Sequence, residues 1–140
     1  MADSDSMSLS FHINFNDQCQ AAFEFYAQVL NGQIGTMLQF KDSPAAASVA
    51  PQRQSKIVHA NINIEGVEIA GADVEASQYT APTGFFILLG FASELQVEAV
   101  FARLAQGGEV IMAPQQTFWS ACYAIVIDRF GVPWKLNCGN

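Results

Sequence analysis

The chain has 140 residues, of which 51% are hydrophobic and 14% charged, and its net charge is −7. This composition is typical of one folded domain with a hydrophobic core and argues against disorder. Its six basic residues are scattered, whereas nucleic acids and anionic membranes need clustered positive charge, so neither is expected as a partner. The chain has no run of about eighteen apolar residues, so no transmembrane helix is expected.

The start of the chain, MADSDSMSLS, is acidic and rich in serine. It lacks the basic start and apolar run of a secretory signal, so we expect residues 1–9 to be flexible and the protein to be cytoplasmic. Cys19, Cys122 and Cys138 are odd in number and have no CxxC spacing. We therefore expect reduced thiols with structural roles.

The first half of the chain begins with an alternating segment, SFHINF at residues 10–15, which predicts a half-buried strand. A helix is expected next, capped by Asn16 or Asp17 and stopped at Gly32. Three further strands are expected at residues 34–40, 57–64 and 67–73, the last two joined by a Glu65-Gly66 turn.

The second half repeats this order. A strand is expected at residues 84–91, followed by a helix that opens with the capping box SELQ at 93–96 and ends at Gly107-Gly108. The segment EVIMA then predicts a strand, and residues 121–127 and 133–138 predict two more, joined around DRFG. Asp128 is expected to cap this last turn, and Arg129 to be solvated.

The predicted fold class is therefore α+β, with two βαβββ modules at residues 10–74 and 84–138 and a link at 75–83. Together they form a single domain over residues 10–140. Residues 41–56 show no periodicity and are long for a connection, so we expect a flexible loop or lid there.

Paired βαβββ modules resemble the vicinal oxygen chelate superfamily, which contains glyoxalase I, extradiol dioxygenases and bleomycin-resistance proteins. The segments INFNDQCQAAFEFYAQVLNG, HANINI…EIAGAD and QQTFWSACYAIVIDRFGVPWKLN resemble its PhnB-like branch over roughly residues 10–138. The resemblance implies a cup-shaped mixed sheet with helices on its outer face, and a homodimer. Members often carry a demethylubiquinone methyltransferase label, but the chain has no glycine-rich loop for S-adenosylmethionine.

The superfamily's enzymes hold a divalent metal with ligands from the first and fourth strands of each module. Carried over to this chain, those positions are His12, Glu68 or Ala70, Phe86 and Asn137. A phenylalanine cannot bind metal and an amide replaces the usual glutamate, so we expect no metal or other cofactor. If a divalent metal does bind, His12 and Glu68 are its predicted ligands.

The branch's closing motif places glycine, a basic residue and a second glycine where this chain has Ser120, Cys122 and Ala124. The missing basic residue argues against an anionic substrate shared with relatives. The two added side chains predict a narrower cavity.

Strand alternation predicts which side chains line the cup. Those on the first module are rich in His and Asn, and those on the second are aromatic and aliphatic, which suits a small, partly polar organic ligand. The predicted ligand-binding residues are His12, Asn14, His59, Asn61, Phe86, Trp119, Tyr123 and Asn137.

Each of these residues also has a structural explanation. Asn61 and Asn63 could serve only to form hydrogen bonds across the sheet. The two histidines could form hydrogen bonds with neighbouring backbone or water. Trp134 is expected in the core, whereas for Trp119 both roles stay open.

The sequence therefore predicts a small-molecule-binding protein that works by sequestration or sensing. The alternative is a divalent-metal-dependent isomerase, lyase or dioxygenase, in which His12 and Glu68 hold the ion. The ligand's identity, any catalysis, module swapping in the dimer and the role of residues 41–56 stay open.

Overall fold

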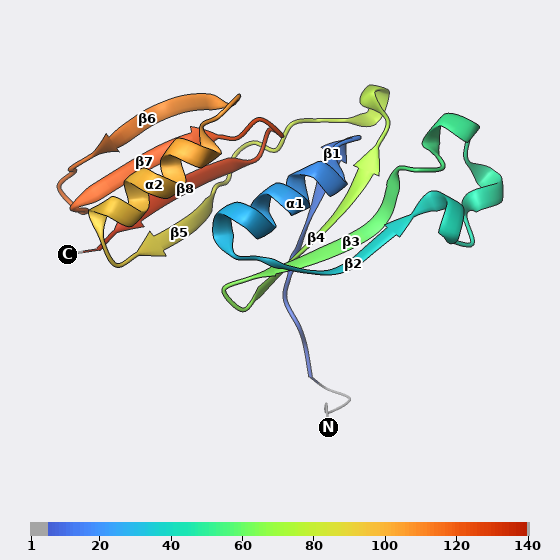
Figure 1. Cartoon of the computed structure of the whole chain (residues 1–140), viewed down its shortest axis with the longest axis horizontal. Helices are drawn as coiled ribbons and strands as arrows, with labels where there is room; N and C mark the ends of the chain where they lie inside the picture. Colours follow the sequence, from blue (N-terminus) through green and yellow to red (C-terminus); the bar gives the residue numbers. More distant parts are fainter. Residues whose placement is uncertain (1–5, 140) are drawn as a thin grey trace. The chain divides into compact units, whose positions relative to one another are not determined.

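The computed structural model describes residues 6–139 and forms two compact units, divided between Ser77 and Gln78. Each unit contains a four-stranded mixed sheet with one long helix packed on it (Figure 1). This confirms the predicted α+β fold with two βαβββ modules. The first unit contains β1 (Phe11–Asn16), α1 (Cys19–Leu30), β2 (Gln33–Gln39), β3 (Ile57–Ile64) and β4 (Val67–Val74). The second contains β5 (Ile87–Phe91), α2 (Glu94–Leu104), β6 (Glu109–Gln115), β7 (Cys122–Ile127) and β8 (Pro133–Cys138).

The two sheets have the same topology. Their strand orders are β1-β4-β3-β2 and β5-β8-β7-β6, and in each the first and last strands of the module pair in parallel while the others are antiparallel. The edge strands β2 and β6 both show register shifts against their neighbours. Among the described helices, none is long and apolar enough to cross a membrane.

The core of each unit lies between the sheet and its helix. In the first unit Ile13 and Phe15 on β1 and Ile62 on β3 are buried under α1, whose Ala22 and Phe23 are fully buried. In the second, Leu136 on β8 and Val126 on β7 are buried on the face that packs against α2. Side chains alternate along each strand, so the residues between these positions lie on the face away from the helix. We call this the open face of each sheet.

The start of α1 differs from the prediction. Its N-cap residue is Gln18, which makes no side-chain cap, and the Asp73 carboxylate on β4 instead accepts a hydrogen bond from the Cys19 N–H at 2.8 Å. Asp17 has a positive φ and forms an ion pair with Arg53. A partner distant in sequence therefore performs the capping role that Asn16 or Asp17 was expected to have.

The end of α1 also differs. The left-handed residue is Asn31, with φ 54°, rather than Gly32. Gly32 is needed for another reason, because a Cβ there would lie 2.7 Å from Cδ1 of Ile62. By contrast, the capping box of α2 is confirmed, since Ser93 Oγ accepts from the Gln96 N–H and Gln96 Oε1 accepts from the Ser93 N–H.

The connection at residues 41–56 was expected to be a flexible loop or lid. It contains three 3₁₀ turns, Phe40–Asp42, Ala46–Ser48 and Pro51–Arg53. The Gln54 amide donates to the carbonyl oxygens of Ala46 and Val49, and this holds the turns together. Whether the segment acts as a lid stays a prediction.

Asp128 organises the turn between β7 and β8, as expected. Its Oδ1 accepts hydrogen bonds from the Phe130 and Val132 N–H groups, and its Oδ2 accepts one from Trp134 Nε1 at 2.8 Å. Trp134 is fully buried, which confirms its core role. Arg129 is exposed, and its guanidinium group lies over the Phe130 ring.

Replacement of Asp128 tests this turn. Asp128→Ala leaves two backbone donors and an indole donor without their acceptor, so we expect the free energy of unfolding to fall by about 3 kcal/mol. Asp128→Asn keeps one acceptor oxygen, so its free energy of unfolding should fall by less than that of Asp128→Ala. Chemical denaturation measures both, and equal losses for the two variants would contradict the assignment.

Candidate functional site

The open face of the first sheet carries the predicted polar residues. His12 and Asn14 lie on β1, and His12 Nε2 is 2.9 Å from Asn14 Oδ1. His12 pairs with Ala70 on β4, and Glu68 lies two residues away on the same face of β4. His12 and Glu68, the residues predicted to hold a metal if one binds, are therefore on adjacent strands of one face.

Asn61 has a structural role on this face. Its Oδ1 accepts a hydrogen bond from the Thr36 N–H at 2.9 Å, where the register of β2 shifts between Ile34 and Met37. The amide also fills the space beside Gly35, where a Cβ would collide with it. Asn63 Oδ1 similarly accepts from the Gly66 N–H in the turn that follows β3. His59 is exposed and lies opposite Leu38.

The donor set for a metal is small. Within residues 6–139, no group of three or more His, Cys, Asp or Glu side chains could hold an ion. His12 and Glu68 are two potential ligands, whereas protein sites for divalent ions generally use three or more. The residues of this face alone do not form a complete metal site.

The open face of the second sheet is more distinctive. Tyr123 on β7 pairs with Asn137 on β8, and the Trp119 ring packs edge-on against Tyr123 with centroids 5.2 Å apart. Trp119 is 47% exposed, whereas Tyr123 is buried. Asn137 Oδ1 is buried and has no hydrogen-bond partner within residues 6–139. An unpaired buried carbonyl costs about 1–3 kcal/mol, so a rotation of this amide that brings its oxygen to a ligand's donor would recover that free energy.

Phe86 and Lys135 extend this face. Phe86 precedes β5, which begins three residues later than predicted, and its ring lies 4.6 Å from Lys135 Nζ. Lys135 lies on β8 two residues before Asn137 and is the one basic residue within the described strands. We did not predict Lys135 as a site residue, although the alternation of PWKLNC places it on the same face as Asn137.

Of the three residues of the closing motif, two lie on the face covered by α2 and one forms hydrogen bonds with the backbone. Ser120 is buried, and its hydroxyl lies 2.9 Å from both the Cys122 and Cys138 carbonyl oxygens. Ala124 and Cys122 occupy the face covered by α2, so the prediction that Ala124 narrows the cavity is wrong. Burial raises the pKa of the Cys122 thiol, and the charges of Glu94 and Glu98 on α2 add to this effect.

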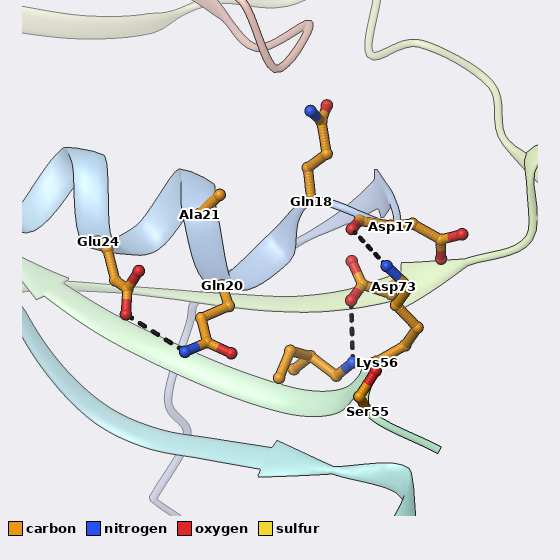
Figure 2. A pocket seen from close by; sticks show the side chains of 9 residues that line it. Asp17, Gln18, Gln20, Ala21, Glu24, Ser55, Lys56 and Asp73 are labelled. Carbon is orange, nitrogen blue, oxygen red and sulfur yellow. Dashed lines mark hydrogen bonds between the residues drawn. The ribbon is translucent and has the colours of Figure 1, made fainter. Parts of the chain in front are cut away.

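A pocket of about 300 Å³ lies elsewhere in the first unit, at the start of α1 (Figure 2). The Asp73 carboxylate beside it accepts hydrogen bonds from the Cys19 and Ile57 N–H groups at 2.8 and 2.9 Å. Burial raises the pKa of Asp73, and burial together with the Asp73 charge raises the pKa of Cys19 to about 12.

Two further polar side chains of this pocket also form hydrogen bonds. The Gln20 amide donates to Glu24, and Lys56 Nζ donates to the Asp17 carbonyl oxygen (Figure 2). The Asp73 carboxylate anchors the start of α1 to the sheet, and the buried polar group of this pocket therefore already has its partners.

Comparison with known proteins identifies the family. Residues 7–137 match the family described as 3-demethylubiquinone-9 3-methyltransferase. The chain belongs to this family. Protein YjdN of Escherichia coli K12 is 30% identical to it over 139 residues, covering 94% of this chain and 95% of YjdN.

Solved structures agree with this assignment. Protein PA1353 from Pseudomonas aeruginosa has 35% identity and a TM-score of 0.86, covering 96% of this chain and 98% of its own. A putative 3-demethylubiquinone-9 3-methyltransferase, PhnB protein, from Bacillus cereus has 19% identity and a TM-score of 0.82, covering 95% and 100%. This confirms the predicted PhnB-like membership.

More distant structures share the fold. A glyoxalase/bleomycin resistance protein/dioxygenase family enzyme from Burkholderia phytofirmans has 17% identity and a TM-score of 0.65, covering 94% of this chain and 98% of its own. The fosfomycin resistance protein FosX from Listeria monocytogenes, solved in one form with Mn(II), has 13% identity and a TM-score of 0.64, covering 97% and 93%. The protein therefore has the vicinal oxygen chelate fold.

Two asparagines on the open faces should respond oppositely to the same substitution. Asn137→Leu removes an unpaired buried carbonyl, so without ligand we expect the free energy of unfolding to rise by about 1 kcal/mol. Asn61→Leu removes the acceptor for the Thr36 N–H and should lower the free energy of unfolding by about 1–2 kcal/mol. Urea denaturation of both variants measures the difference, and losses of similar size at the two positions would refute it.

Proposed function

We propose that this protein binds a small, partly polar organic molecule on the open faces of its sheets, and that it works by sequestration or sensing. The observation that supports this most strongly is the group formed by Trp119, Tyr123 and Asn137. It combines a half-exposed indole with a buried acceptor that lacks a partner. Binding sites typically combine an aromatic surface with a few polar groups that fix the ligand's orientation.

The first unit contributes polar groups of a different kind. His12, Asn14 and His59 lie on the open face and are not buried. Asn61 accepts a hydrogen bond from the Thr36 N–H of β2, so we assign it a structural role rather than a contact with the ligand. That the two modules enclose a common cup stays a prediction from the family resemblance.

A screen of small aromatic molecules by thermal shift tests the proposal. A ligand at one hundred times its dissociation constant stabilises the native state by about 2.7 kcal/mol, which gives a clear rise in melting temperature. We expect Trp119→Ala to abolish most of that rise. Leu95→Ala, which removes a 77% exposed apolar side chain from α2, is the control and should keep it. A rise that survives in Trp119→Ala would place the ligand elsewhere.

A divalent-metal-dependent isomerase, lyase or dioxygenase is the second candidate. It is supported by the position of His12 and Glu68 on one face of adjacent strands, and by the fold shared with FosX. The same thermal-shift assay with nickel, zinc, manganese and ferrous iron tests it. A rise that His12→Ala loses would support this candidate, whereas no rise with any of the four metals would eliminate it.

We also propose that the protein is a homodimer. Val110 and Ile111 on the edge strand β6 are about half exposed, and apolar surface of this kind is often covered by a second subunit. Light scattering at micromolar concentration measures the mass directly. A mass equal to one chain of 15.2 kDa would contradict the dimer.

A further inference from the structure

Lys135 occupies an unusual place in an acidic protein. The chain carries six basic and thirteen acidic residues, and Lys135 is the one basic residue within the described strands. Its ammonium group lies over the Phe86 ring, and no carboxylate in the described part of the chain pairs with it. The one acidic residue in the four strands of this sheet, Glu109, lies on β6 opposite Ile127.

The Phe86 ring fixes the position of this charge without neutralising it. A cation over an aromatic face is attracted by the ring's quadrupole and keeps its full positive charge. Lys135 is only partly exposed, so its charge acts in surroundings that screen it less than bulk water does. A small anion would therefore find a positioned and unpaired cation on this face.

Asn137 is the second polar group on the same strand. It follows Lys135 by two residues, so both side chains leave the same face of β8 with Cα atoms roughly 7 Å apart. Its Oδ1 is buried and lacks a donor, so the amide gains a hydrogen bond if it rotates toward a ligand. A ligand that satisfies both residues carries an anion at one end and an O–H or N–H donor at the other, separated by about the width of one aromatic ring.

The aromatic side chains on this face complete the description. Phe86 stands beside the cation, and Trp119 packs on Tyr123, the strand partner of Asn137. Both Phe86 and Trp119 are more than one-third exposed, so their rings have surface left for stacking. Resting on the proposed binding function, we infer that the ligand is a planar aromatic carboxylate with a hydroxyl or amino group at the opposite end of the ring, held by Lys135 and Asn137.

Three matched probes test this inference in the full-length protein by isothermal titration. The first, 4-hydroxybenzoate, has both features. The second, 4-methoxybenzoate, lacks the donor, and the third, 4-hydroxybenzamide, lacks the charge. We expect the first to bind at least about tenfold more tightly than either of the others. A hydrogen bond to the charged Lys135, or one to the otherwise unpaired oxygen of Asn137, contributes that much or more to the binding free energy.

Variants assign each preference to its residue. Lys135→Met should remove the preference for carboxylate over amide and leave that for hydroxyl over methoxy, whereas Asn137→Leu should do the reverse. Arg103→Gln makes the same change in net charge from the last turn of α2, on the other face of the sheet, and should keep both preferences. A cooperative unfolding transition in urea shows that each variant is folded.

The outcomes separate this inference from the proposed function. If the neutral amide binds wild type as tightly as the acid, or if Lys135→Met keeps the preference for the acid, the inference is wrong. If none of the probes binds while the aromatic screen yields another ligand that Trp119→Ala loses, the inference is wrong and the proposed function stands. If neither experiment yields a ligand, both are wrong.

Discussion

Each sheet of this protein is covered by a helix on one face only, and the alternation of side chains along the strands is the constraint on which everything else depends. On β8, Trp134, Leu136 and Cys138 are buried under α2, so Lys135 and Asn137 must lie on the opposite face. A shift of one residue would exchange the core for the open face. The same pairing register that builds the core therefore also sets the positions of the polar groups on the open face.

The two modules secure this register with different buried carboxylates. In the first unit Asp73 binds the N–H groups of Cys19 and Ile57, which join the start of α1 and the start of β3 to β4. In the second unit Asp128 binds the turn before β8 and the indole of Trp134. The modules share strand order but not these anchors.

Period-two and helical patterns in the sequence were enough to predict the fold, because the side chains that are buried recur at short, regular spacings along each strand and helix. The capping box at Ser93 and the turn at Asp128 were predictable for the same reason, since each involves partners within six residues. The cap of α1 was not, because Asp73 lies 54 residues from Cys19. Only the folded chain brings them together.

The candidate site was predicted unevenly for similar reasons. Alternation placed His12, Asn14, Tyr123 and Asn137 on the expected faces, but it could not show that Asn61 serves the β2 backbone. The family motif alone does not give the strand register, which places Ala124 opposite Leu136 on the face covered by α2, whereas the alternation along β8 does place Lys135 on the open face. The unpaired oxygen of Asn137 depends on packing in three dimensions and has no sequence signal.

The register shifts of β2 and β6 have a consequence for the protein in concentrated solution. Both strands lie at sheet edges, where a regular ladder of free N–H and C=O groups would recruit a strand from another molecule. A bulge interrupts that ladder, and in β2 the Asn61 side chain on β3 accepts the Thr36 N–H hydrogen bond where the register shifts. The irregular backbone of β2 and β6 disfavours the addition of a strand at these two edges, so self-association through either of them must rely on side-chain packing.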